Sequence, residues 1–262
     1  MTDSANIWKV GGVSITGFSH YEESIPCQDA HAFKIKDQSR IIAAVADGAG
    51  SARLSHIGAQ AFADAVVGHI FNLPPSNTFD RELIASEIVS SVNEIREQLI
   101  RHGDDLLDDG APYIGDFAAT LVVVVADPDG GAFFHVGDGA GAAFTHGRED
   151  QEATVSKPQN GEYANETYFV TMDGWEKYLR VTPFIDNHDT ILLMSDGVTP
   201  MAMSQGCSSP AFKLFVNPVV KFLRDNDDAK GETGLINTLS GENVRKITGD
   251  DKTLLWAIRF QN

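Results

Sequence analysis

The order of hydrophobic patterns along the chain predicts an α+β fold, a four-layer αββα sandwich in which helix pairs flank two central, mostly antiparallel sheets. Two observations support this prediction. Strand-like runs occur before and after a long helical region, and further helices precede a last strand. Helices and strands also come in groups, whereas parallel βαβ folds alternate them one by one. No linker, repeat or low-complexity tract interrupts the pattern, so residues 1–262 are expected to form a single domain.

The first part of the chain is predicted to form strands and then a helix pair. Strand patterns occupy residues 7–19, 30–36 and 41–46, and the last is a continuous apolar run typical of a buried strand. From Ser55 onward, apolar residues recur at helical spacing. A second helix follows, and Thr78 or Asp80 can cap its first turn. Pro74 and Pro75 lie in the turn between the two helices, which are expected to be antiparallel and to cover one face of a sheet.

The second part of the chain is predicted to contain mostly strands and one helical region. Strand patterns occupy residues 118–126, 132–136, 141–145, 166–171 and 190–194. The segment DPDGG at 127–131 is typical of a hairpin turn between the first two of these strands. Apolar residues at helical spacing follow between Phe212 and Leu223, where Pro218 is expected to bend or divide the helix. Residues 253–260 form the predicted last strand.

The composition disfavours several classes of protein. The formal net charge is −17, which makes nucleic acid or an anionic membrane a poor partner because phosphate groups need a basic surface. Cys27 and Cys207 form neither a disulfide framework nor a zinc-binding spacing. No apolar run approaches the ~18 residues of a membrane span, and the N-terminal residues do not resemble a signal peptide. A cytoplasmic location is therefore expected.

Carboxylates stand at the ends of predicted strands in five places. The segments are PCQDAHAF (26–33), IIAAVADGAG (41–50), FFHVGDGAG (133–141), ILLMSDGVT (191–199) and TGDDKTLLWAI (248–258). Carboxylates that meet at one sheet edge repel one another unless a cation neutralises them. Oxygen ligands without clustered Cys or His favour Mg²⁺ or Mn²⁺. We therefore expect Asp47, Asp196 and Asp250 to converge on a pair of such ions.

A pair of divalent ions predicts a particular chemistry. Two ions about 3.5–4 Å apart can bridge a water molecule, lower its pKa and hold phosphoryl oxygens. The bridging hydroxide would then attack phosphorus in line, without a covalent enzyme intermediate. The chain has no GxSxG motif and no cysteine in a phosphate-binding loop, which is consistent with attack by water.

Six short motifs together resemble the metal-dependent protein phosphatase 2C family in its compact bacterial form. They are PCQDA, VADGAGS, DFAATL, VGDG, SDG and GDDKT, and they occur in the order of that family between about Gly17 and Trp256. The resemblance implies an αββα sandwich with two Mg²⁺ or Mn²⁺ ions that dephosphorylates phosphoserine and phosphothreonine. It also implies a phosphorylated protein as substrate and a serine/threonine kinase that opposes the reaction.

The resemblance assigns roles to the acidic residues of these motifs. Asp47 matches the residue that bridges both metals, and Gly48 matches the backbone carbonyl ligand beside it. Asp196 and Asp250 match ligands of the first metal.

Three further residues complete the set that the resemblance implies. Asp29 matches a carboxylate that holds metal-bound waters, and Asp138 matches the residue that, with Asp196, holds a third and weaker metal in bacterial members. Thr120 matches a threonine with a structural role.

The chain also departs from the family pattern. Ser24 stands five residues before Asp29, where the family usually has an arginine that grips the substrate phosphate. Ala49 stands where eukaryotic members often have a histidine, Gln28 replaces an acidic residue, and Asp251 replaces an asparagine. Phosphate must therefore be bound by another residue.

Arg53 and His20 are the candidates for that role. An arginine can bind a phosphate group through two parallel hydrogen bonds, which favours Arg53. His20 can bind phosphate or supply a proton to the leaving alkoxide, and we include it among the predicted catalytic residues with Asp47, Asp196 and Asp250.

The leading hypothesis is therefore a Mg²⁺- or Mn²⁺-dependent serine/threonine protein phosphatase. One alternative is a catalytically weak or inactive module with the same fold that acts in signalling or binding. The retained carboxylates disfavour it, since clustered buried charges are costly. The other alternative is a metal-dependent phosphodiesterase or nuclease, which the negative charge disfavours.

Overall fold

The computed structural model describes residues 8–37, 39–74, 79–103, 106–107, 110–127, 130–148, 153–159, 167–184, 188–203 and 210–260. Two five-stranded sheets form its centre, and every pairing between their strands is antiparallel. The first sheet has the order β1 (Trp8–Ile15), β10 (Lys252–Arg259), β9 (Thr190–Met194), β6 (Ala140–Phe144) and β7 (Thr154–Ser156). The second sheet has the order β2 (Asp29–Lys36), β3 (Arg40–Asp47), β4 (Leu121–Asp127), β5 (Gly130–Val136) and β8 (Arg180–Phe184).

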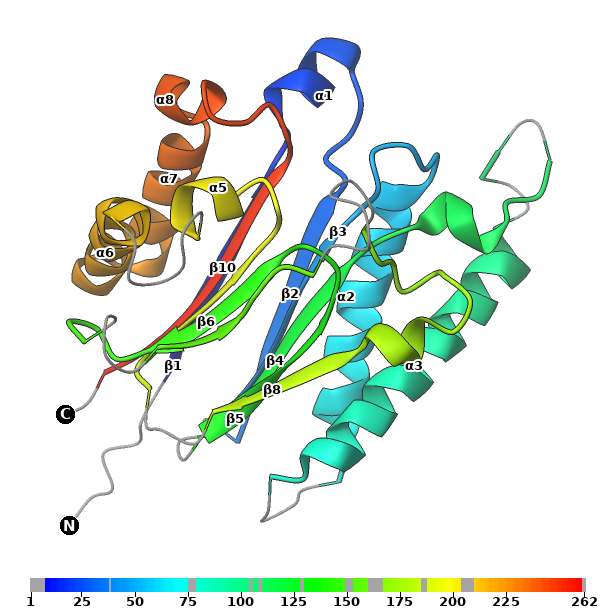
Figure 1. Ribbon diagram of the computed structural model, residues 1–262, viewed down its shortest axis with the longest axis horizontal. Coiled ribbons are helices and arrows are strands. Elements are labelled where there is room, and N and C mark those ends of the chain that lie inside the picture. Colours follow the sequence, from blue (N-terminus) through cyan, green and yellow to red (C-terminus); the bar gives the residue numbers. More distant parts are fainter. Residues whose placement is uncertain are drawn as a thin grey trace.

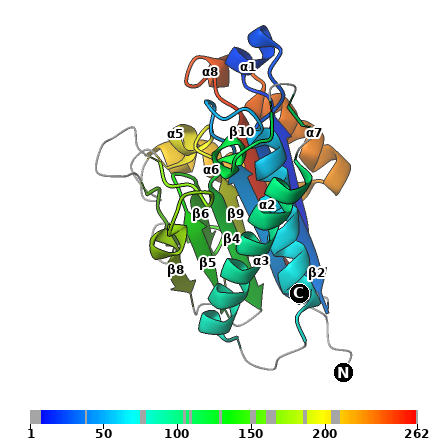
Figure 2. The same ribbon diagram turned by 90° about the vertical axis from the view of Figure 1, so that its right-hand side faces the viewer.

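Helices cover the outer faces of both sheets, which confirms the predicted αββα sandwich (Figure 1 and Figure 2). The second sheet is covered by α2 (Ser55–Asn72) and α3 (Arg81–His102). The first sheet is covered by α5 (Thr199–Ala202), α6 (Pro210–Asp225) and α7 (Asp228–Leu239). Two short helices, α1 (Phe18–Glu23) and α8 (Glu242–Arg245), lie at one end of the sandwich, opposite the start of β1 and the end of β10 (Figure 1). The 3₁₀ helices η1 (Ile114–Phe117) and η2 (Trp175–Tyr178) lie on the side of α3.

Three apolar layers hold these elements together, and β3 shows how the sequence builds them. Successive side chains of a strand point to opposite faces of the sheet. Ile41, Ala43 and Val45 therefore pack between the two sheets, while the residues that alternate with them pack under α2 and α3. A strand buried on both faces has no polar positions, which explains the continuous apolar run at 41–46.

Most predicted elements are present with small shifts of their ends. Asp80 caps α3 by accepting hydrogen bonds from the backbone N–H groups of Glu82 and Leu83, whereas Thr78 lies outside the described residues. β4 and β5 pair as the predicted hairpin, with Asp127 opposite Gly130 and residues 128–129 outside the described part.

Two predictions of secondary structure are wrong, and a third is wrong in part. Phe18 and Ser19, the end of the predicted strand 7–19, instead begin α1, because the backbone of this segment bonds to the loop before β10. Pro218 lies inside one helix, α6, and does not divide it, while a bend at this residue stays a prediction. Within the predicted strand 166–171, Glu166 lies outside the described residues and only Thr167 forms a bridge. The backbone N–H of Val170 instead donates to the Ala119 carbonyl, and this contact lies outside any strand.

The described helices were also searched for segments long and apolar enough to cross a bilayer, and none of them qualifies.

Gly58 allows α2 to pass close to η1, which gives a test of the packing. A Cβ atom at Gly58 would lie 2.1 Å from the carbonyl oxygen of Phe117, whereas one at Gly68 of the same helix would meet nothing within 4 Å. We expect Gly58→Ala to lower the free energy of unfolding by about 1–3 kcal/mol through this clash. Gly68→Ala is the matched control and should raise it by about 0.5–1 kcal/mol, since alanine favours a helix. Urea denaturation followed by circular dichroism measures both changes, and equal stabilisation by the two variants would contradict the packing.

Candidate metal centre

The antiparallel sheets place the predicted acidic residues at the end of the sandwich that carries α1. β3 ends at Asp47 and β2 begins at Asp29, and these two residues face each other in the strand register. Asp196 follows β9 and Asp250 precedes β10, which pair with each other, and Asp138 lies in the turn between β5 and β6. Strand ends that are distant in sequence therefore meet in space.

Three of the predicted ligands form a tight cluster. One carboxylate oxygen from each of Asp47, Asp138 and Asp196 lies within 4.8 Å of the others, and all three side chains are half-buried. Asp250 and Asp29 are not members of this cluster. Asp250 is exposed, and Asp29 is buried at 7% exposure.

The electrostatics of the cluster resemble those of a cation site. Burial raises the pKa of Asp47 well above its usual range, and the charges of Asp29 and Asp196 raise it further. Burial also raises the pKa of Asp196 to about 6, with further contributions from the charges of Asp250 and Asp138. Each carboxylate is thus destabilised by its neighbours in the absence of a counter-charge.

The pKa of Asp29, which pairs with Asp47 in the strand register, is also raised. Burial raises its pKa to about 7, the nearby Ser195 hydroxyl lowers it, and the charge of Asp251 raises it again. The Thr253 hydroxyl also lowers it.

These residues fit a hard divalent cation. The Oδ1 atom of Asp196 is buried without a hydrogen-bond partner among the described residues. A buried polar atom in that state needs a partner, and carboxylate oxygens are the ligands that Mg²⁺ and Mn²⁺ prefer.

Neighbouring polar groups hold the clustered carboxylates in place. The Thr120 hydroxyl accepts a hydrogen bond from the backbone N–H of Asp47 at 3.1 Å, which agrees with the structural role expected for Thr120. The Thr167 hydroxyl donates to Asp138 at 2.6 Å. Gly197 lets the loop after β9 approach the loop before β10, since a Cβ atom there would lie 1.8 Å from the Asp251 carbonyl oxygen.

A hydrogen bond also fixes the backbone of Gly48. Its backbone N–H donates to the Gln28 carbonyl at 3.0 Å, so β2 and the residue after β3 are joined at the centre. A ligand role for its carbonyl stays a prediction.

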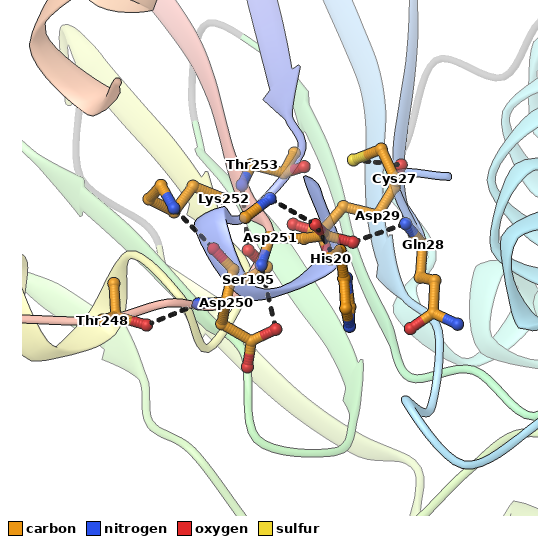
Figure 3. Close-up of polar contacts among 11 residues, drawn as sticks. His20, Cys27, Gln28, Asp29, Ser195, Thr248, Asp250, Asp251, Lys252 and Thr253 are labelled. Atoms are coloured by element: carbon orange, nitrogen blue, oxygen red, sulfur yellow. Dashed lines mark hydrogen bonds and ion pairs between the residues drawn. The ribbon is translucent and has the colours of Figure 1, made fainter. Parts of the chain in front are cut away.

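Asp250 and Asp251 are adjacent, but their environments differ (Figure 3). Asp250 accepts a hydrogen bond from the N–H of Asp251 at 2.9 Å, and its own carbonyl accepts one from the Lys252 amine. Asp251 is 2% exposed and accepts hydrogen bonds from the backbone N–H groups of Gly17 at 2.6 Å and Gln28 at 2.5 Å. Its carboxylate therefore joins three separate segments of the chain.

His20 lies next to the carboxylate of Asp251. Its Nδ1 atom lies 3.0 Å from Oδ1 of Asp251, and its side chain is 16% exposed (Figure 3). A carboxylate this close to a ring nitrogen restricts the orientation of the histidine.

Arg53 has a different partner. Its guanidinium forms a two-point ion pair with Asp116, at 2.8 and 2.9 Å. This pair holds the pKa of the buried Asp116 carboxyl below its usual range. Arg53 thus joins the loop after β3 to η1, and a contact with phosphate stays a prediction.

Sequence reasoning did not identify the residues that support the ligands. Four of them lie inside the recognised motifs, and membership of a motif was the signal that could have identified them. They are Asp251, Thr253, Ser195 and Asp116. Thr167 lies outside them, and only the fold brings it to Asp138.

Comparison with known proteins identifies the family to which this sandwich belongs. The sequence model described as Protein phosphatase 2C matches residues 16–240. The chain therefore belongs to the protein phosphatase 2C family, as its motifs predicted. Serine/threonine-protein phosphatase 3 of Escherichia coli (strain K12) is 28% identical over 261 residues, which cover 95% of this chain and 99% of that protein.

Solved structures share the fold along nearly the whole chain. Serine/threonine phosphatase Stp1 from Staphylococcus aureus superposes with a TM-score of 0.62 at 12% identity, covering 100% of this chain and 98% of that one. RsbX in complex with magnesium superposes with a TM-score of 0.54 at 15% identity, covering 97% and 100%. At these identities the likeness is one of fold.

The raised pKa values predict how the stability of the metal-free protein depends on pH. A carboxyl group with a raised pKa in the folded state favours folding below its ordinary pKa of 3.8, and that contribution is lost as the pH rises through the folded value, about 7 for Asp29. In EDTA, the free energy of unfolding should therefore fall as the pH rises from about 4 to about 7. Asp29→Asn should reduce this fall by on the order of 1–3 kcal/mol.

Denaturant unfolding at a series of pH values measures this effect. Asp173→Asn is the matched control, because Asp173 is exposed and distant from the centre in sequence. Mn²⁺ added at neutral pH should restore stability to the wild type more than to Asp29→Asn. The same pH profile for Asp29→Asn and the wild type would contradict the assignment.

Proposed function

We propose that this chain is a Mg²⁺- or Mn²⁺-dependent serine/threonine protein phosphatase, with residues 1–262 as one catalytic domain. Its substrate would be a phosphorylated protein, and its reaction would oppose a serine/threonine kinase. The observation that carries the proposal is the convergence of Asp47, Asp138 and Asp196, with raised pKa values at Asp47 and Asp196. Membership of a protein phosphatase family supports the same conclusion.

The carboxylates would hold the metal ions. Asp47, the Gly48 carbonyl, Asp196 and Asp250 would be the ligands of a pair of ions. Asp29 would hold water at this centre. Asp138 shares the cluster with Asp196 and would hold a third ion. The magnesium bound by RsbX supports a hard divalent ion.

Bound divalent ions supply an activated water and neutralise phosphoryl oxygens. The remaining steps depend on the residues of this chain. His20, whose Nδ1 atom lies 3.0 Å from Asp251, would donate a proton to the alkoxide of serine or threonine as it leaves. Arg53 is the candidate for holding the phosphate, and its pair with Asp116 fixes its position near the loop after β3.

A catalytically weak module is the second candidate. The absence of the family arginine at Ser24 and the engagement of Arg53 with Asp116 favour it. The same experiment tests both proposals.

Turnover of a phosphothreonine peptide decides between them. The wild type should release phosphate with Mn²⁺ and not in EDTA. Asp196→Ala should fold and lower kcat by at least about 100-fold, since it removes charge from the cluster. Asp173→Ala, a change of the same type at an exposed position, should leave kcat unchanged. No phosphate release from a folded wild type would favour the binding module.

Leaving-group dependence tests the role of His20. His20→Gln should lower kcat on a phosphothreonine peptide by about 100-fold or more, because the departing alkoxide needs a proton. The same variant should affect p-nitrophenyl phosphate much less, because p-nitrophenolate leaves as the anion. Equal losses on both substrates would show that His20 acts on binding or folding instead.

A further inference from the structure

A groove lies beside the metal centre, on the other side of α1. Its volume is about 450 Å³, and its lining comes from the end of β1, from α1, α7 and α8, and from the start of β10. Phe18, Tyr21 and Ile236 contribute large apolar side chains that are 42%, 76% and 45% exposed. Exposed aromatic and aliphatic groups around one concave surface are typical of a binding site.

The helix α1 separates this groove from the proposed catalytic histidine. Residues three apart lie on the same face of a helix, so Phe18 and Tyr21 share one face and both line the groove. His20 lies between them in sequence and turns to Asp251 instead (Figure 3). A chain that crosses α1 can therefore contact the groove and the centre at the same time.

The groove and the centre also share the loop before β10. Lys252 lines the groove, and its amine donates to the carbonyl of Asp250, a proposed metal ligand (Figure 3). The backbone N–H of Ser19 bonds to the Gly249 carbonyl at 3.1 Å, so α1 rests on this loop. These two hydrogen bonds connect the elements that line the groove to the loop that carries Asp250.

Arg245 gives the groove a positive charge in a strongly acidic chain. Its guanidinium lies over the Phe18 ring, 5.4 Å from the centroid, and it forms no ion pair with any residue in the described part of the chain. The net charge of the chain is −17. An exposed arginine without a carboxylate partner, next to apolar surface, is complementary to an apolar side chain accompanied by a carboxylate.

We propose that this groove binds the segment of the phosphoprotein substrate that flanks the phosphorylated residue, and that it selects an aromatic or aliphatic side chain next to an acidic one. The inference rests on the proposed phosphatase function. It adds a specificity site that lies outside the metal centre.

A set of phosphothreonine peptides tests the proposal. Each peptide carries one Phe-Glu pair, placed at successive positions on either side of the phosphothreonine in an alanine background. The wild type should prefer peptides with the pair on one side, because the groove lies on one side of the centre. Arg245→Glu should lower kcat/KM for the preferred peptide about fivefold through KM, and leave p-nitrophenyl phosphate unchanged.

Two control variants make the test specific. Lys246→Glu makes the same change of charge at the next residue, which is exposed and outside the groove, and it should leave the preferred peptide unaffected. Ile236→Ser should weaken the preference for Phe over Ala in the flanking pair, whereas Ile247→Ser, at an exposed position outside the groove, should not.

The proposal is overturned if the wild type ignores the position of the pair, if Arg245→Glu and Lys246→Glu behave alike, or if Arg245→Glu lowers turnover of p-nitrophenyl phosphate as well. If the wild type hydrolyses neither substrate, the proposed phosphatase function fails by itself. Fluorescence anisotropy of the same labelled peptides then tests the groove separately. Binding that Arg245→Glu weakens supports it, and binding that the variant leaves unchanged ends it.

Discussion

The repulsion between carboxylates at one end of the sandwich is the constraint on which the rest of the site depends. Burial, together with the charges of neighbouring carboxylates, raises the pKa values of Asp29, Asp47 and Asp196. Such an arrangement persists only when the surrounding fold is stable enough to impose it. Two packed sheets with helices on both faces provide that stability, and a bound cation would remove the repulsion.

Asp250 and Asp251 are adjacent aspartates with different environments and different roles. Asp251 is almost fully buried, yet two backbone N–H groups and the ring of His20 surround its carboxylate. The two backbone hydrogen bonds stabilise the buried carboxylate, so this residue organises the loops around the centre. Asp250 is exposed, and its charge raises the pKa of Asp196. An exposed carboxylate this close to Asp196 is consistent with the proposed role of Asp250 as a metal ligand. Neighbouring positions in one motif thus separate structural and chemical roles.

The loss of the family arginine at Ser24 changes how the neighbouring segment must work. In this chain the segment before Asp29 contains α1, which places His20 beside Asp251 and Phe18 in the groove. Proton donation and substrate selection would then depend on opposite faces of one short helix. Asp116 holds the guanidinium of Arg53 in a two-point pair, so this candidate for phosphate binding is fixed at the loop after β3 and not at the position of Ser24.

The sequence by itself determined the αββα class, most strand positions and the acidic residues at the strand ends. These features are local, because periodicity and strand-end motifs are readable from neighbouring residues. Only the tertiary structure decided that Asp138 joins Asp47 and Asp196, that Asp251 is a buried structural group, and that residues 18–23 form a helix. Those outcomes depend on contacts and burial between segments that are distant in sequence, which no local pattern records. Gly17 and Asp251, for example, are 234 residues apart.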